Sequence, residues 1–121
     1  MRILLAHNSL FFPSHGGGDK SNRLLVEALA ARGHECLAVA RTSSFGARAQ
    51  EELLRELAAR AVEVISAQDG VVTFRHAGVA VHAVAADPHF RAYFAAQIAA
   101  FQPDAILTST DDPAQLLWKR R

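Results

Sequence analysis

The chain has 121 residues, about half of them hydrophobic, and a formal net charge of +1. This length predicts one domain, and the apolar content excludes intrinsic disorder. The nearly balanced charge excludes the strongly basic surface of a dedicated nucleic-acid-binding protein. One cysteine cannot form an internal disulfide, so a reducing, cytoplasmic compartment is the simplest expectation. The sequence shows no signal-peptide pattern and no apolar run of about 18 residues, so we expect no transmembrane segment.

The first forty residues follow the order strand, loop, helix, strand. Residues 2–6 form an apolar run typical of a strand buried on both faces, and residues 7–18, rich in Gly and Ser, are predicted to be a loop. Asp19 is expected to cap the following helix, and Gly33 to end it. The predicted core stripe of this helix is Leu25, Ala28, Leu29 and Arg32. A second apolar strand at 36–40 completes a βαβ unit, whose strands are parallel.

A second helix follows the polar residues 42–46. Its predicted core stripe is Leu53, Leu57 and Ala61. Residues 62–65 fit either a continuation of this helix or the start of a strand.

Alternating apolar and polar residues on both sides of positions 77–78 predict a β-hairpin. The predicted pairs are His76 with Val79, Phe74 with Val81, and Val72 with Ala83. One face of the hairpin is then mostly apolar. The other face carries Thr73, Arg75 and His82. Alanine is a poor residue for a turn that needs positive φ, so this register depends on an unusual use of Ala77.

A third helix is predicted to open at Asp87, and residues 104–109 to form another strand. The predicted core stripe of the helix is Phe90, Phe94, Ile98 and Phe101. A last helix starting at Pro113 has only one or two turns before Arg121, so we expect the chain, one domain over 1–121, to be incomplete at its C-terminal end. The predicted class is α/β: a Rossmann-like, open and mostly parallel sheet with helices on both faces and a β-hairpin around Gly78.

The glycine-rich loop after the first strand is the first candidate site. Gly16, Gly17 and Gly18 precede a helix at the carboxyl end of a strand, where backbone N–H groups and the helix dipole favour an anion. The loop matches neither the dinucleotide fingerprint nor the P-loop. A surface loop that merely connects two elements is the alternative.

Other candidates lie near the same edge. His7, followed by Asn8, and His15 are either ligand contacts or solvated loop residues, and Asp111 is open to both interpretations. Phe11, Phe12 and Phe45 lie in loops at this end of the sheet and indicate a partly apolar binding surface. Cys36 is predicted to be a core residue rather than a nucleophile. The histidine spacing does not fit a metal site, and none is expected.

Two segments resemble a known family. The first runs from Met1-Arg2-Ile3-Leu4-Leu5 through Gly16-Gly17 to Leu29-Ala30-Ala31-Arg32-Gly33-His34-Glu35, and the second is Gln102-Pro103-Asp104-Ala105-Ile106-Leu107. Together they resemble the N-terminal half of a GT-B glycosyltransferase of the retaining group called family 4 or group 1. The hairpin around Gly78 also has a counterpart there.

The resemblance implies an enzyme with two Rossmann-like domains facing each other across a cleft. It implies that this domain binds a sugar or lipid acceptor, with His7, Asn8, Phe11, His15 and Asp111 as candidate contacts. It further implies that the amides of Gly16, Gly17 and Gly18 contact the diphosphate of a nucleotide-sugar donor, with no metal and no other cofactor. The family's histidine after the Pro-Asp strand is absent, because Thr108-Ser109-Thr110-Asp111 stands there. The donor-binding domain is also absent, so the catalytic residues are unknown and we expect this chain alone to be inactive.

The alternative function is a free-standing Rossmann-like module that binds a small phosphorylated ligand or a protein partner. An unpaired strand edge left by the missing segment is expected to promote self-association. The complete enzyme is expected in the cytoplasm, with membrane association as the alternative.

Overall fold

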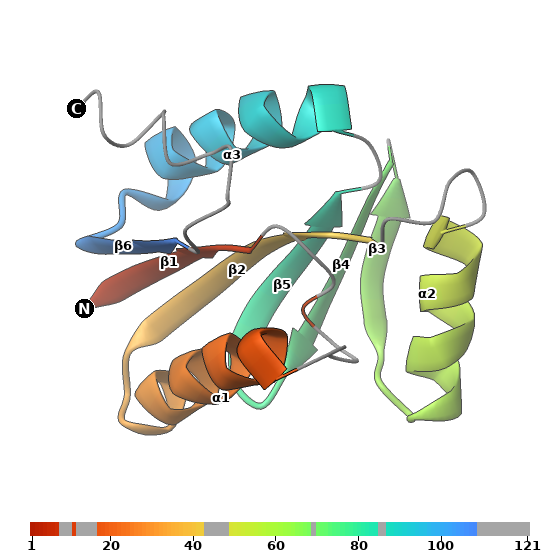
Figure 1. Ribbon diagram of the computed structural model, residues 1–121, viewed down its shortest axis with the longest axis horizontal. Coiled ribbons are helices and arrows are strands. Elements are labelled where there is room, and N and C mark those ends of the chain that lie inside the picture. Colours follow the sequence, from red (N-terminus) through yellow and green to blue (C-terminus); the bar gives the residue numbers. More distant parts are fainter. Residues whose placement is uncertain (8–10, 12–16, 43–48, 69, 85–86, 109–121) are drawn as a thin grey trace.

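The computed structural model describes residues 1–7, 11, 17–42, 49–68, 70–84 and 87–108 (Figure 1). In chain order the elements are β1 (Arg2–Ala6), α1 (Gly17–Ala31), β2 (Glu35–Arg41), α2 (Ala49–Ala59), β3 (Val64–Gln68), β4 (Val71–His76), β5 (Val79–Val84), α3 (Asp87–Phe101) and β6 (Ala105–Thr108). Val64 and Ile65 therefore start a strand rather than extend α2.

The strands form one mixed sheet in the order β3-β4-β5-β2-β1-β6. Strands β5, β2, β1 and β6 are mutually parallel, whereas β3 and β4 join them by antiparallel pairing. The predicted α/β class, the βαβ unit and the three parallel strands near 2–6, 36–40 and 104–108 are confirmed.

The β4–β5 hairpin has the predicted register. His76 pairs with Val79, Phe74 with Val81 and Val72 with Ala83. The turn residues Ala77 and Gly78 have φ of 50° and 81°. Both values are positive, as in the primed turns whose twist matches a hairpin. Ala77 therefore takes a conformation that an L-residue with a Cβ adopts at a cost of roughly 1 kcal/mol.

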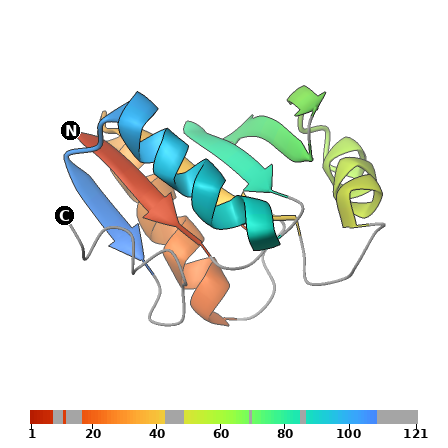
Figure 2. The same ribbon diagram turned by 90° about the horizontal axis from the view of Figure 1, so that it is seen from above.

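Helices cover both faces of the sheet, as predicted (Figure 2). On one face, called here the α1/α2 face, Val26, Leu53 and Leu57 pack with alternate residues of the strands, including Phe74. On the other, the α3 face, Phe94 packs with Leu4, Leu37 and their neighbours. The alternation of each strand decides which face its residues enter.

The phase of α1 differs from the prediction. Val26 is fully buried, whereas Leu25 is 51 % exposed and Ala28 is also exposed. The half-buried pair of Arg23 and Glu27, 2.8 Å apart, faces the hairpin, where His76 Nε2 lies 3.4 Å from Glu27. Apolar residues occur all around this helix, so its periodicity does not fix which side meets the sheet.

Helix boundaries correct two further expectations. Helix α1 begins at Gly17, so Asp19 lies within the first turn instead of preceding it. Leu53 and Leu57 are buried as predicted, but Ala61 lies beyond the end of α2 and is exposed, with φ of 57°. The amide of Val62 donates to the carbonyl of Leu57 at 2.9 Å, which places Ala61 in the left-handed position of a Schellman motif. Gly33, with φ of 95°, ends α1 in the same way, as predicted.

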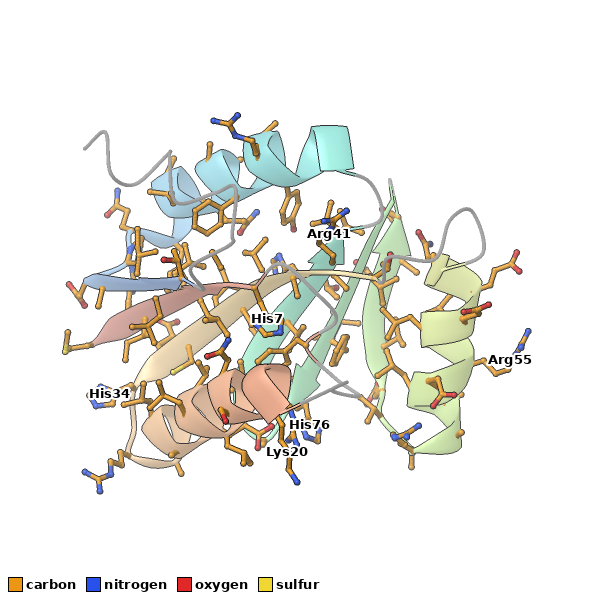
Figure 3. All side chains as sticks on the ribbon, in the orientation of Figure 1. His7, Lys20, His34, Arg41, Arg55 and His76 are labelled. Carbon is orange, nitrogen blue, oxygen red and sulfur yellow. The ribbon has the colours of Figure 1, made fainter. Side chains whose placement is uncertain are left out.

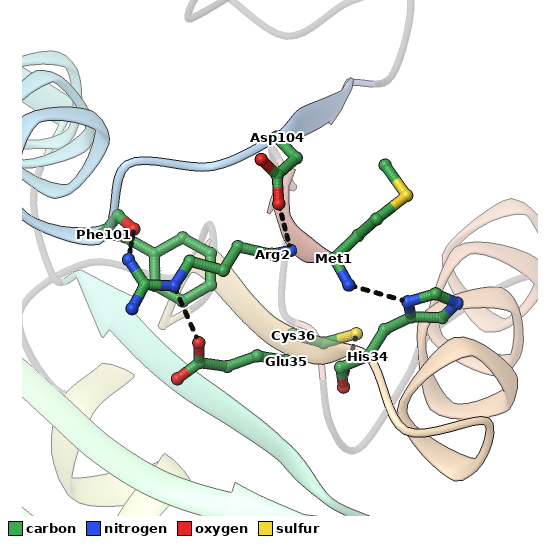
Figure 4. Close-up of polar contacts among 7 residues, drawn as sticks. All are labelled: Met1, Arg2, His34, Glu35, Cys36, Phe101 and Asp104. Carbon is green, nitrogen blue, oxygen red and sulfur yellow. Dashed lines mark hydrogen bonds and ion pairs between the residues drawn. The ribbon is translucent and has the colours of Figure 1, made fainter.

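A polar cluster holds the amino edge of the sheet together (Figure 4). Arg2 donates from Nε to Glu35 Oε2 and from Nη1 to the carbonyl of Phe101, both at 3.0 Å. The backbone amide of Arg2 donates to Asp104 Oδ2 at 2.8 Å. These contacts join β1, β2 and the end of α3, and so fix β6 beside β1.

Candidate functional site

The carboxyl ends of the parallel strands lie at one edge of the sheet, called here the carboxyl edge. Helix α1 runs back along the sheet from this edge, so its first turn lies near the end of β1 (Figure 1). Ligands of open α/β sheets bind at such edges. The residues immediately after β1 and β2 and the start of α1 therefore form the candidate site.

His7 follows β1 and is 1 % exposed. Its amide donates to the carbonyl of Val39 at 3.0 Å, which extends the β1–β2 pairing by one residue. Figure 3 shows the ring between α1 and the sheet. The alternative of a solvated loop histidine is therefore wrong, and any ligand contact of His7 takes place from a buried position.

Phe11 is 1 % exposed and belongs to the core of the α1/α2 face. Its ring meets that of His7 edge-on, with centroids 6.0 Å apart and an interplanar angle of 84°. The expected apolar surface is wrong at Phe11, because this side chain is part of the core, and Phe12 and Phe45 lie outside the described residues. As an acceptor contact Phe11 remains a prediction that its burial does not support.

Thr42 follows β2 and is also 1 % exposed. Its amide donates to the carbonyl of Val84 at 3.1 Å, but its Oγ1 has no hydrogen-bond partner within the described part of the chain. A buried hydroxyl without a partner costs about 1–3 kcal/mol. Such a group at a strand end is a candidate polar contact for a bound molecule.

Helix α1 begins at Gly17, followed by Gly18. The first four N–H groups of a helix have no partner within it, and the helix dipole places positive charge there. Lys20, in the same turn, is exposed and points away from the sheet (Figure 3). Among the described groups of this turn, the backbone N–H groups are therefore the ones placed to bind an anion.

The structure thus brings His7, Phe11 and the glycines at 17 and 18 to the same end of the sheet. Gly16, Asn8, His15 and Asp111 lie outside the described residues. Sequence reasoning missed Thr42, the residue after the end of β2. The signal that could have found it is its position, because it follows the carboxyl end of a parallel strand, as His7 does.

Cys36 does not contribute to this site. It is 3 % exposed in the core, and burial raises the pKa of its thiol. The prediction of a core cysteine is confirmed, since a reactive cysteine needs a stabilised thiolate. Within the described ranges, no three histidine, cysteine or acidic side chains are grouped so that they could hold a metal ion.

No helix in the described ranges is long and apolar enough to cross a membrane. Comparison of the chain with protein-family models, with curated proteins and with solved structures finds no match.

Proposed function

We propose that this chain is the acceptor-side, Rossmann-like domain of a retaining GT-B glycosyltransferase. The observation that carries the proposal is the start of α1 at Gly17-Gly18 near the carboxyl end of β1. It is supported by the resemblance of residues 1–35 and 102–107 to that family. The sheet order supports the proposal as well. Strand β1 belongs to the first segment that resembles the family and β6 to the second, and the two are parallel neighbours in the sheet.

In this proposal the amides of Gly16, Gly17 and Gly18 contact the donor diphosphate. The bond between the sugar and the diphosphate breaks, the acceptor hydroxyl forms the new glycosidic bond, and its proton is lost. Negative charge develops on the leaving diphosphate, so preorganised N–H donors stabilise the transition state. A second α/β domain supplies the nucleotide-sugar pocket and excludes water from the cleft.

The burial of His7 and Phe11 changes their proposed part in acceptor binding. Both are buried and their rings meet edge-on, so in this proposal they support the site from the core rather than touch the acceptor. Asn8, His15 and Asp111 remain the proposed direct acceptor contacts. Thr42, whose hydroxyl lacks a described partner, is as buried as His7 and would meet an acceptor only from that buried position. The proposed setting is the cytoplasm, with acceptors that include membrane lipids.

The experiment uses the product of the complete open reading frame and a panel of nucleotide-sugars. We expect Gly17→Val to lower turnover about 10²–10³-fold, since it blocks one oxyanion-type contact. Ala28→Val, on the exposed side of the same helix, is the matched control and should change turnover less than twofold. Gly17→Val kinetics within threefold of wild type, at unchanged thermal stability, would show that the loop only connects two elements.

The second candidate is a free-standing module that binds a small phosphorylated ligand. It is favoured by the same helix start, which lies wholly within this chain. An open reading frame that stops at Arg121, together with phosphate-dependent binding and no transfer activity, would select it over the transferase.

A further inference from the structure

The α3 face carries a groove of about 470 Å³. Helix α3 packs on β1 and β5, and Figure 2 shows that it leaves β3 and β4 uncovered. The groove lies along the resulting step, between the second half of α3 and strand β4. Its volume falls within the range of about 300–1,000 Å³ that is usual for small-molecule sites.

Two polar side chains of the hairpin line the groove. Arg75 and His82 enter the same face, because Arg75 pairs with Ala80, and His82 is two residues further along β5. The Cα atoms of such diagonal neighbours lie roughly 7–8 Å apart, so one small ligand can reach both side chains. Arg75 is exposed and has no ion-pair partner within the described part of the chain. Its charge is therefore available to a ligand.

A contact with Tyr93 of α3 holds the ring of His82 in place. Its Nδ1 lies 2.6 Å from the Tyr93 hydroxyl, and the rings are 5.8 Å apart. Burial lowers the pKa of His82 and raises the pKa of Tyr93, so both are neutral at pH 7. When the hydroxyl donates to Nδ1, the imidazole proton is on Nε2, the other ring nitrogen. His82, which lines the groove, then carries its hydrogen-bond donor on Nε2.

The remaining lining completes a small site. Gln97 of α3 adds an amide on the wall opposite Arg75, while Leu37 and Ala80 supply an apolar floor. Glu35 also lines the groove, but Arg2 is bound to it at 3.0 Å (Figure 4). The negative charge of Glu35 is thereby balanced by Arg2. Because of Arg75, the groove then has an excess of positive charge and of hydrogen-bond donors.

We propose that this groove binds a small molecule carrying a carboxylate or phosphate group on a compact apolar body. The oxyanion contacts Arg75 and Nε2 of His82, with Gln97 as a further donor, and the apolar part lies over Leu37 and Ala80. The site goes beyond the transferase proposal, because it lies on the α3 face and includes neither the glycine loop nor the carboxyl edge.

The test is a titration of the isotope-labelled chain, followed by the amide and imidazole NMR signals. The probes are benzoate and phenyl phosphate, with benzyl alcohol as the probe that lacks an anion. We expect saturable shifts at His82 and at the Gln97 side-chain amide with either anionic probe, and no saturation with benzyl alcohol. Binding of benzoate alone assigns the carboxylate, and binding of phenyl phosphate alone assigns the phosphate. Shifts that never saturate, or that lie outside the groove, would overturn the proposal.

Two variants make the test specific. Arg75→Gln should weaken binding about tenfold, the usual loss for one charge-assisted hydrogen bond. Arg55→Gln removes another exposed arginine, from α2 on the other face, and should leave binding unchanged (Figure 3). Equal affinities for Arg75→Gln and the unchanged chain would reject the site. Arg75 is exposed, so the fold should survive, which the amide spectrum will show.

The imidazole ¹⁵N signals test the role of His82 separately. In the unchanged chain they should show the Nε2–H tautomer, and Tyr93→Phe should shift the population toward Nδ1–H and weaken probe binding. A dominant Nδ1–H tautomer in the unchanged chain would contradict the assignment of His82 as a donor.

Discussion

The two faces of the sheet are covered differently. On the α1/α2 face, two helices lie over the strands, and Val79, Val81 and Ala83 of β5 are fully or almost fully buried. On the α3 face, one helix covers part of the sheet, and His82 of the same strand remains half-buried at a groove. One strand therefore contributes to a closed core on one face and to a polar groove on the other, because its side chains alternate between the two faces.

The histidines of the hairpin show the same contrast. His76 faces α1 and the pair of Glu27 and Arg23, whereas His82 faces α3 and Tyr93. Burial lowers the pKa of both. On the α1/α2 face the carboxylate of Glu27 opposes this shift, whereas on the α3 face the neutral hydroxyl of Tyr93 contacts the ring of His82.

The largest expected effects are those of core truncation on each face. Phe74→Ala and Phe94→Ala remove rings that are 1 % and 0 % exposed from the two cores. Each should lower the free energy of unfolding by about 3–5 kcal/mol, measured by urea denaturation. Phe101→Ala, at a half-buried position, is the comparison and should cost less. A loss below about 1 kcal/mol for Phe94→Ala would show that α3 does not close a core of its own.

Neighbouring residues of α1 test which side of this helix meets the sheet. Val26→Ala should cost about 2 kcal/mol, since two buried methyl groups are lost. Leu25→Ala, at a 51 % exposed position, should cost about 0.5 kcal/mol or less. Thermal denaturation of both variants decides between the two phases. The reverse order of losses would restore the stripe expected from the sequence.

Positive φ at Ala61 predicts a stabilising substitution. Ala61→Gly should raise the free energy of unfolding by about 1 kcal/mol, because glycine adopts this conformation without a Cβ penalty. Ala58→Gly, inside α2, has the same change of composition and should instead lower it by about 1 kcal/mol. If both variants are destabilised alike, α2 does not end in the left-handed cap.

The smallest expected effect is a pH dependence of stability. The folded-state pKa of His76 and His82 lies below the usual 6.5, so between the folded and unfolded values the unfolded chain binds more protons. Stability is therefore complete above about pH 6.5 and falls as the pH drops toward the folded values. His82→Gln should remove a larger part of this fall than His76→Gln, because Glu27 opposes the shift of His76. The midpoints of urea denaturation between pH 7.5 and pH 5 measure this fall in stability. Midpoints that do not change with pH would contradict the prediction.

Much of the fold could be predicted because it depends on local patterns. The apolar runs gave β1, β2 and β6, and the alternation around Gly78 gave the hairpin register in full. The phase of α1 could not be predicted, since apolar residues surround the helix and the contact of the Arg23–Glu27 pair with the hairpin is not visible in the sequence. The end of α2 was missed because Ala61 stands where glycine is usual.

The candidate site was only partly predictable. Strand ends located His7 and the start of α1, but loop composition hid the burial of Phe11 and Thr42. A loop aromatic looks exposed in a sequence, and only the path of the chain shows that it fills a core. The groove could not be predicted for a similar reason, because the sequence places Arg75 and His82 on one face of the hairpin but does not show where α3 lies on that face.

If the start of α1 binds the diphosphate of a donor, this chain should bind inorganic pyrophosphate there. A titration with pyrophosphate, followed by the backbone amide NMR signals, measures this directly. We expect saturable shifts that are largest at Gly17 and Gly18 in the first turn of α1, with Gly33 at the far end unchanged. Shifts that are absent at both glycines, or that occur only at exposed lysine and arginine residues elsewhere, would contradict it.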